Sequence, residues 1–100
     1  MARELVYRPA AEADLHAIDD WIAEHADPLT AYAYVSRIHA ACRSLTDAPD
    51  RGTPRDDLEP GLRSISFRRR ATIYYRVDAR VVEIVRILSR GADAGRAFGD

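Results

Sequence analysis

The junction at Asp27-Pro28 is the sequence feature that most restricts how this chain can fold. Aspartate followed by proline is typical of a helix start, because the carboxylate can cap the first turn and proline fits the first helical position. One helical pattern precedes the junction, from Pro9 to about His25, and a second follows it until Pro49. Only one or two residues separate the two patterns, so we expect an antiparallel helical hairpin.

Each helix of the hairpin has an apolar face. In the first helix it comprises Leu15, Ile18 and Ile22, with Trp21 at its edge. Acidic residues fill most of the rest of this helix: Glu12, Asp14, Asp19, Asp20 and Glu24. In the second helix the apolar face comprises Val35, Ile38, Cys42 and Leu45. These faces predict that the hairpin packs against another layer of the protein.

Strand patterns lie on both sides of the hairpin. One strand is expected at 4–8, before the first helix, and three more are expected at 62–67, 71–77 and 81–88, after a Pro- and Gly-containing loop at 50–61. A weak helical tail follows at 92–98. The order β-α-α-β-β-β predicts an α+β fold in which the hairpin packs on a small antiparallel sheet, as one domain over residues 1–100. Both faces of the last strands are apolar, so the face away from the helices would be covered by a partner or by the chain's own tail.

The charges are distributed unevenly along the chain. The formal net charge is −1, yet residues 1–50 carry four arginines against nine acidic residues, and residues 51–100 carry eleven against seven. The arginines of the strand region are Arg63, Arg68, Arg69, Arg70, Arg76, Arg80, Arg86 and Arg90. This surface could bind nucleic acid through phosphate contacts and interleaved aromatic rings, receive an acidic protein segment, or pair with the acidic helices of the chain itself.

Residues that would carry catalysis or bind a metal are scarce. Cys42 is the single cysteine, which excludes a disulfide framework and a multi-cysteine zinc site, and its place on the apolar face indicates a core thiol. His16, His25 and His39 lie on the helices without a third metal ligand or a nucleophile motif, and no glycine-rich phosphate loop occurs. We therefore expect no cofactor and no metal. No apolar run is long enough to span a membrane and no secretory signal is visible, so a cytoplasmic protein is expected.

Several segments, taken in order, resemble a known family. They are Tyr7-Arg8-Pro9-Ala10-Ala11-Glu12-Ala13-Asp14-Leu15, Ile18 with Trp21-Ile22, Leu45 with Pro49 and Gly52, Asp57-Leu58-Glu59-Pro60-Gly61-Leu62-Arg63-Ser64, Ile73-Tyr74-Tyr75-Arg76-Val77 and Val82-Glu83-Ile84-Val85-Arg86-Ile87-Leu88. In this combination the chain resembles the ParE toxins of bacterial type II toxin–antitoxin systems, within the RelE/ParE superfamily. The resemblance implies two helices on a small antiparallel sheet and a cognate ParD-like antitoxin whose C-terminal segment wraps the toxin.

The resemblance also implies one of two activities. Members of the ParE branch poison DNA gyrase, whereas members of the RelE branch cleave mRNA in the ribosome. RelE-type cleavage uses lysines and an arginine on the first two meander strands, where this chain has Ser64, Ser66 and Thr72, and a tyrosine near the C-terminus, where this chain has none after Tyr75. These differences favour the ParE branch. Ser89 stands where many relatives carry a histidine, which weakens any role for a histidine there.

The expected function is therefore inhibition of gyrase by binding rather than by catalysis, with neutralisation by an antitoxin that lays an amphipathic, acidic segment on the sheet and helices. The residues expected to contact the antitoxin are Arg63, Arg76 and Arg86, through carboxylates, and Tyr75 and Trp21, through apolar contacts. Both aromatic residues are also expected to belong to the core. The residues expected to contact the target are Arg90, Arg96 and Phe98, and truncation of residues 90–100 is expected to reduce toxicity while sparing antitoxin binding.

Two alternatives to gyrase inhibition remain open at this point: a ribosome-dependent mRNA endonuclease with an unusual arginine set, and a non-toxic binding module that acts with the antitoxin. No sequence-specific contact with nucleic acid and no membrane contact are expected.

Overall fold

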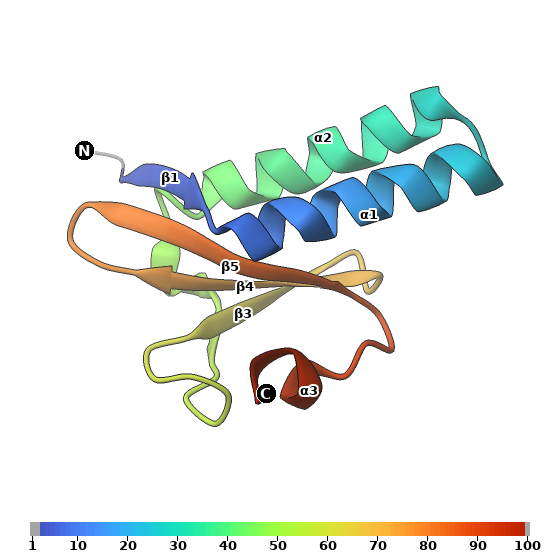
Figure 1. Ribbon diagram of the computed structural model, residues 1–100. Helices are drawn as coiled ribbons and strands as arrows, with labels where there is room; N and C mark the ends of the chain where they lie inside the picture. Colours follow the sequence, from blue (N-terminus) through green and yellow to red (C-terminus); the bar gives the residue numbers. More distant parts are fainter. Residues whose placement is uncertain (1–2, 100) are drawn as a thin grey trace.

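The computed structural model describes residues 3–99, which form a helical hairpin, a five-stranded sheet and a short C-terminal helix (Figure 1). The elements in chain order are β1 (Glu4–Tyr7), α1 (Pro9–His25), α2 (Pro28–Ser44), the 3-10 turn η1 (Pro49–Arg51), β2 (Thr53–Pro54), β3 (Arg63–Phe67), β4 (Ala71–Val77), β5 (Val81–Ser89) and α3 (Ala94–Phe98). The expected α+β order is confirmed, and the short strand β2 is an addition to it.

The helical hairpin forms where the sequence predicts it. The Asp27 carboxylate caps α2, because its Oδ1 accepts a hydrogen bond of 2.7 Å from the backbone N–H of Thr30 and its Oδ2 accepts one of 2.9 Å from the Thr30 hydroxyl. α2 ends at Ser44, before Pro49, because the chain turns at Leu45 to bury that side chain completely. The α1–α2 hairpin therefore follows from local capping and from the two apolar faces.

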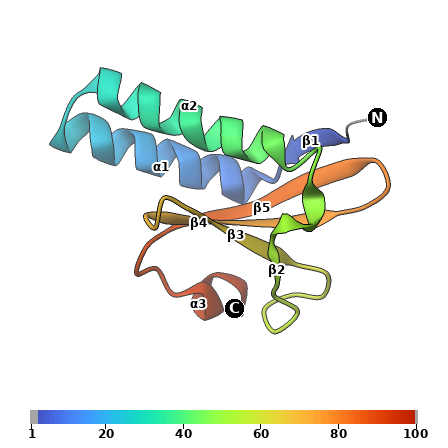
Figure 2. The same cartoon turned by 180° about the vertical axis from the view of Figure 1, so that it is seen from behind.

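The sheet is mixed rather than purely antiparallel, with the strand order β1-β5-β4-β3-β2. β1 runs parallel to β5, with Glu4 opposite Val81 and Tyr7 opposite Ile84, and the other pairs are antiparallel. A parallel pair needs a long crossover, which the helical hairpin and the other strands supply between β1 and β5. β2 pairs only through Thr53 and Pro54, at the edge of the sheet seen in Figure 2, where proline is tolerated.

The two faces of the sheet bury two separate cores. The larger core lies between the sheet and the hairpin, and its fully buried side chains include Ile38, Leu45, Ile73, Tyr75 and Ile84. The second core lies on the opposite face and comprises Leu62, Tyr74, Val85 and Leu88, with Leu58, Ala94, Ala97 and Phe98 packed against it. Figure 1 shows α3 on this side, away from α1 and α2. The chain's own tail therefore covers the second apolar face.

Candidate interaction groove

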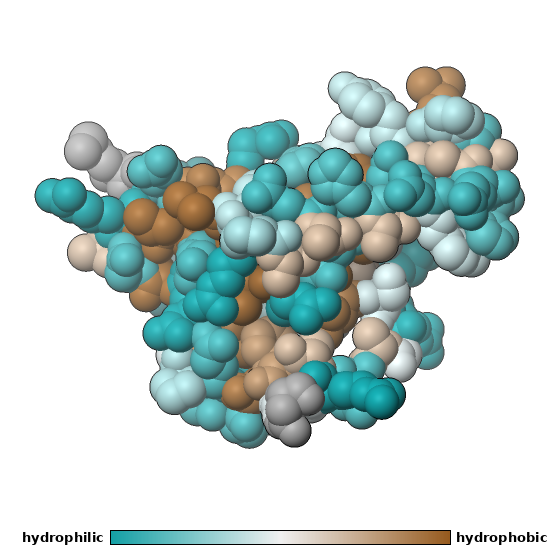
Figure 3. Space-filling view, viewed as in Figure 1, coloured by the Kyte–Doolittle hydropathy of each residue, from teal (hydrophilic) through white to brown (hydrophobic). Residues whose placement is uncertain are grey.

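A groove opens where the helical hairpin extends past the end of the sheet. Figure 1 shows the far ends of α1 and α2 reaching beyond the point where β5 turns down towards α3. The space between these elements has a volume of about 590 Å³. Figure 3, from the same side, shows hydrophobic surface in the recess between the helices and the C-terminal segment. We call this space the hairpin groove.

The hairpin groove is lined mainly by apolar side chains from both layers. Its residues are Asp14, Ala17, Ile18, Trp21, Ile22, Ala26, Thr30, Tyr34, Arg70, Ile87, Leu88, Ser89 and Ala92. Two of them, Asp14 and Arg70, are charged. The Asp14 carboxylate is already bonded within the chain, so Arg70 is the lining charge that stays available to an occupant. The groove therefore suits an apolar segment with an acidic group at its edge.

One residue that lines the hairpin groove, Asp14, is held in an ion pair with Arg86 of β5. Arg86 donates to Asp14 through both Nε and Nη2, each at 2.8 Å, and the Asp14 carboxylate also accepts a bond of 2.8 Å from the backbone N–H of Ile87. Both side chains are largely buried, at 25% and 14% exposure. The bond to the Asp14 carboxylate raises the pKa of Arg86 above its ordinary value. Arg86 does not itself line the groove, but it fixes the lining carboxylate of Asp14 on α1 to β5.

Trp21 is the largest side chain of the groove, and it is 62% exposed. Its indole stacks on the His25 ring, with the centroids 4.0 Å apart and the planes 12° apart. The expectation that Trp21 belongs to the core is wrong, because the side chain lines the open hairpin groove and stays exposed to solvent. An indole that is held by stacking and yet open to solvent is well placed for an apolar contact with a partner.

Arg63 and Tyr75 lie away from the hairpin groove and organise a turn. Tyr75 is fully buried, as expected of a core residue. Its hydroxyl donates to the carbonyl of Pro49 at 2.7 Å and accepts from the backbone N–H of Gly52 at 2.9 Å. Arg63 Nη2 donates to the carbonyls of Asp50 and Gly52, at 3.0 and 2.8 Å. These side chains bind the chain's own backbone around η1.

Arg76 takes part in a network of ion pairs with Glu59. Its Nη1 lies 2.7 Å from Glu59 Oε2, and Arg8 approaches the same oxygen at 3.5 Å. Arg8 also pairs with Glu83 at 3.1 Å. The network ties the start of α1 to β4, β5 and the loop before β3. Of the five side chains predicted to meet the antitoxin, the structure thus places one, Trp21, in the lining of the hairpin groove, whereas Arg86 pairs with the lining residue Asp14.

The residues predicted to contact the target lie around α3 and the start of the tail. Arg90 lines a separate polar hollow of about 410 Å³, together with Ser66, Arg69, Thr72 and Ser89. Arg96 is exposed on α3. Phe98 packs its ring against that of Tyr74, with the centroids 5.1 Å apart, so it belongs to the second core. These three side chains therefore do not form one continuous surface patch of like chemistry.

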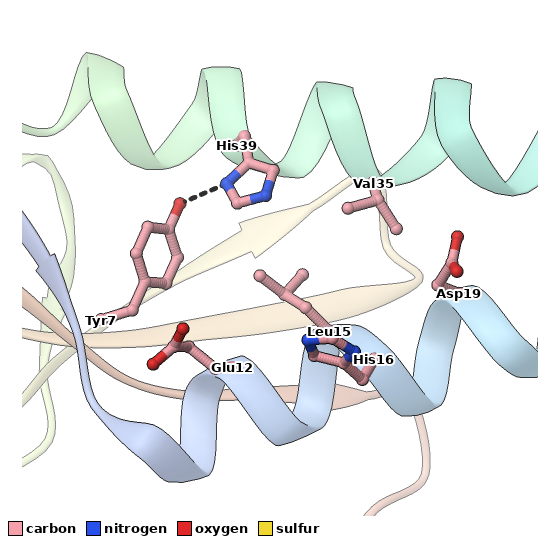
Figure 4. Close-up of a pocket in the computed structure, with 7 residues that line it drawn as sticks. All are labelled: Tyr7, Glu12, Leu15, His16, Asp19, Val35 and His39. Carbon is pink, nitrogen blue, oxygen red and sulfur yellow. Dashed lines mark hydrogen bonds between the residues drawn. The ribbon is translucent and has the colours of Figure 1, made fainter.

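A smaller hollow of about 280 Å³ lies between α1, α2 and β1, with Glu12, His16 and Asp19 around it (Figure 4). Tyr7 Oη and His39 Nδ1 share a hydrogen bond of 2.7 Å at its end. Burial is the main cause that raises the pKa of Tyr7 and lowers that of His39, so both groups are held neutral near pH 7. Among residues 3–99, no three His, Cys, Asp or Glu side chains are placed to hold a metal ion.

Tyr34 and Arg70 are groove residues that sequence reasoning missed. Tyr34 lies one helical turn after Thr30 on α2, on a face next to the predicted apolar stripe. Its ring meets Phe67 edge-on, with the centroids 5.5 Å apart. The Thr30–Tyr34 spacing was a signal for a second contact face of α2. From the sequence, Arg70 is recognised only as part of the general basic surface.

The family model described as the ParE toxin of the type II toxin–antitoxin system, parDE, matches residues 5–94. The chain belongs to the ParE toxin family. It is therefore a type II toxin–antitoxin toxin of the RelE/ParE superfamily. None of the curated proteins compared with it matches the chain.

Two solved structures have folds similar to that of this chain. A chain of the chromosomal ParDE toxin–antitoxin system from P. aeruginosa is 27% identical, with a TM-score of 0.76 over 88% of this chain and 96% of that chain. A chain of the toxin–antitoxin complex RelBE2 from Mycobacterium tuberculosis is 20% identical, with a TM-score of 0.68 over 90% of this chain and 100% of that chain. The second likeness shows the fold alone. Within residues 3–99 of this ParE-family chain, no helix is long and apolar enough to cross a membrane.

Proposed function

We propose that this chain inhibits DNA gyrase by binding it, and that a ParD-like antitoxin neutralises it by placing an amphipathic, acidic segment in the hairpin groove. The observation that carries the antitoxin proposal is the groove itself, an apolar recess of about 590 Å³ with the exposed Trp21 at its side. Toxins of this family are paired with antitoxins, and the similar structure from P. aeruginosa is a ParDE system.

The charges around the groove support an acidic occupant. Arg70 lines the groove and has no carboxylate contact among the described residues, so a glutamate or aspartate of the antitoxin could pair with it. Trp21, Ile18 and Ile22 would take the apolar side chains of the same segment. An amphipathic helix presents these two chemistries side by side, which is the usual way in which such a groove is filled.

Trp21 provides a direct assay, because it is the single tryptophan of the chain. Binding of the cognate antitoxin in the groove would bury the indole and shift its fluorescence to shorter wavelength, provided that the antitoxin itself is free of tryptophan. Trp21→Ala should weaken antitoxin binding about 30-fold or more, since truncation of a central tryptophan costs about 2 kcal/mol or more. This variant has no tryptophan to report binding, so its affinity for the antitoxin is measured by isothermal titration calorimetry.

Tyr32→Ala is the matched control. Tyr32 is 71% exposed on α2 and does not line the groove, so its removal should leave antitoxin affinity within about twofold. Both substitutions remove an exposed aromatic ring, so both variants should fold. If Tyr32→Ala weakened binding as much as Trp21→Ala, or if neither did, the antitoxin would occupy another surface.

Inhibition by binding is supported by the polar hollow near β3 and β4. Ser66 and Thr72 face each other across these strands, at positions where RelE-type cleavage would need basic residues. The side chains that line the hollow include no histidine, aspartate or glutamate, so they supply no acid–base pair for cleaving RNA.

A supercoiling assay with purified gyrase tests the target. The toxin should inhibit supercoiling, and an equimolar amount of antitoxin should restore it. Cleavage of mRNA in a translation reaction, with unchanged supercoiling, would instead assign the chain to the endonuclease branch. Normal growth of cells that express the chain alone would indicate a non-toxic binding module.

A further inference from the structure

Four arginines gather at one end of the sheet, where β3 turns into β4 and β5 leaves for the tail. Arg68, Arg69 and Arg70 form the β3–β4 connection. Arg90 lies beside them, because its backbone N–H donates to the carbonyl of Arg70 at 2.8 Å. All four residues are exposed. We call this group the basic end.

The arginines of the basic end differ in their partners from two arginines inside the sheet, Arg76 of β4 and Arg86 of β5. Arg76 and Arg86 each meet a carboxylate within 3 Å. For the basic end, no ion pair occurs within residues 3–99. The carboxylate of Asp93, which is close in sequence, instead caps α3 by accepting from the backbone N–H of Arg96 at 3.1 Å. The Arg68 guanidinium lies over the Phe67 ring, 5.5 Å from its centroid, but no described carboxylate neutralises the basic end, so its positive charge can meet an external anion.

The backbone at the basic end is unfavourable for the residues that occupy it. Arg68 and Arg69 have φ angles of 50° and 58°, and the N–H of Arg70 closes the turn on the carbonyl of Phe67 at 2.9 Å. A two-residue hairpin turn with two positive φ angles is the position where Asn-Gly is strongly preferred. Placing two arginines there costs backbone energy, which indicates that the side chains serve a purpose other than the turn itself.

The polar hollow next to these arginines offers hydrogen-bond donors. Arg69 and Arg90 line it together with the hydroxyls of Ser66, Thr72 and Ser89, in a volume of about 410 Å³. Guanidinium and hydroxyl groups in this arrangement match the oxygens of a phosphate. A nucleic acid backbone presents such groups in a row, which a single exposed cluster of four arginines can follow.

We propose that the basic end binds the phosphate backbone of duplex DNA. The inference rests on the proposed function, because gyrase acts on duplex DNA and a toxin bound there would meet that DNA. Single-stranded nucleic acid is less suited to this surface, because it is usually held by bases stacked on exposed aromatic rings. Of the rings near this end, Phe67 and Tyr74 are only 8% and 5% exposed, and Tyr34, whose ring meets Phe67 edge-on, is half-buried.

Fluorescence anisotropy with a labelled 30-base-pair duplex, in the absence of gyrase, tests the proposal. Four phosphate contacts predict that the logarithm of the association constant falls with the logarithm of salt concentration at a slope of about −3 to −4. The affinity should then fall about 100-fold between 50 and 200 mM salt. Changing the sequence of the duplex should leave the affinity within about twofold, since backbone contacts carry no sequence information.

The double substitution R68N/R69G separates binding from folding. It installs the preferred turn residues, so the melting temperature should rise, while the salt slope should become less negative by about 2. The single variant Arg90→Ser should weaken binding and make the slope less negative by about 1. Its matched control is Arg80→Ser, which removes the same charge at the opposite end of β4 and should leave the slope unchanged.

Three results would overturn the proposal: no salt-dependent binding to the duplex, unchanged binding by R68N/R69G, or equal losses in Arg90→Ser and Arg80→Ser. Tighter binding to single-stranded RNA of the same length than to the duplex would reject DNA as the ligand. Failure of DNA binding is distinguishable from failure of gyrase inhibition. The supercoiling assay measures the toxin's effect on gyrase, whereas the anisotropy assay contains no gyrase.

Discussion

Replacement of Asp14 tests how far one ion pair holds the hairpin to the sheet. Asp14 lies on α1 and bonds to Arg86 and Ile87 of β5, which are 72 and 73 residues away in sequence. β1 does not reach Ile87, because its last paired residue, Tyr7, lies opposite Ile84. The carboxylate therefore supplies an acceptor for the Ile87 N–H where β1 no longer runs alongside β5.

The expected loss of stability follows from the three hydrogen bonds that the Asp14 carboxylate accepts. A bond to a charged group contributes about 1.5–3 kcal/mol, but Arg86 retains 25% exposure and can recover part of its hydration. We therefore expect Asp14→Ala to lower the free energy of unfolding by about 3 kcal/mol, below the upper values for a fully buried pair. Asp14→Asn keeps an acceptor for Ile87 and loses the charge, so it should cost about half as much.

The assay is urea and thermal denaturation followed by far-ultraviolet circular dichroism. For a chain of 100 residues, a loss of about 3 kcal/mol lowers the melting temperature by about 12–24 °C. Asp20→Ala, an exposed position on the same helix, is the control and should change stability by less than about 0.5 kcal/mol. A loss below about 1 kcal/mol in Asp14→Ala, or no coupling energy in a double-mutant cycle with Arg86→Ala, would refute the reasoning.

Three further predictions concern buried groups. Gly52→Ala should lower the free energy of unfolding by about 2 kcal/mol, because the added Cβ meets the Tyr75 hydroxyl and would break its hydrogen bond to Pro49. In urea denaturation, the loss in a double variant with Tyr75→Phe should be smaller than the sum of the two single losses. Burial raises the pKa of Cys42 to about 11, so a thiol reagent at pH 8 should label it slowly in the native state and rapidly in urea. Burial lowers the pKa of His39 below 6.5, so the stability that its neutral form contributes above pH 6.5 should be lost as the pH falls. In urea unfolding, His39→Gln should remove this part of the pH dependence of stability.

The parts of the fold that sequence predicts well are those decided by neighbours in the chain. The hairpin is an example, because the Asp27 carboxylate caps α2 through Thr30, only three residues away. The β3–β4 and β4–β5 strands are predictable for the same reason, since short turns join them. The parallel pairing of β1 with β5 is different, because Glu4 meets Val81 across most of the chain. A strand pattern at 4–8 does not specify which strand it will join.

The candidate site depends on relationships that sequence pattern does not carry. Trp21 lies at the edge of an apolar stripe, which is compatible with burial, yet it is 62% exposed because it lines the open hairpin groove. The sequence predicts that Arg63, Arg76 and Arg86 pair with carboxylates of the antitoxin. The structure shows that the chain itself supplies acceptors for these three side chains, whereas the four arginines of the basic end have no ion pair among residues 3–99.

The C-terminal tail illustrates how the fold changes an experiment that the sequence suggested. The sequence predicts that truncation of residues 90–100 reduces toxicity and leaves antitoxin binding mostly intact, but α3 covers the second core, where Phe98 packs on Tyr74. Deleting the tail would expose that apolar face together with removing Arg90 and Arg96, so a loss of toxicity would have two causes. Arg96→Ser removes an exposed side chain and leaves the core covered, whereas Phe98→Ala weakens the covering and leaves the charge. Only a loss of gyrase inhibition in Arg96→Ser, at an unchanged melting temperature, would show that the tail contacts the target.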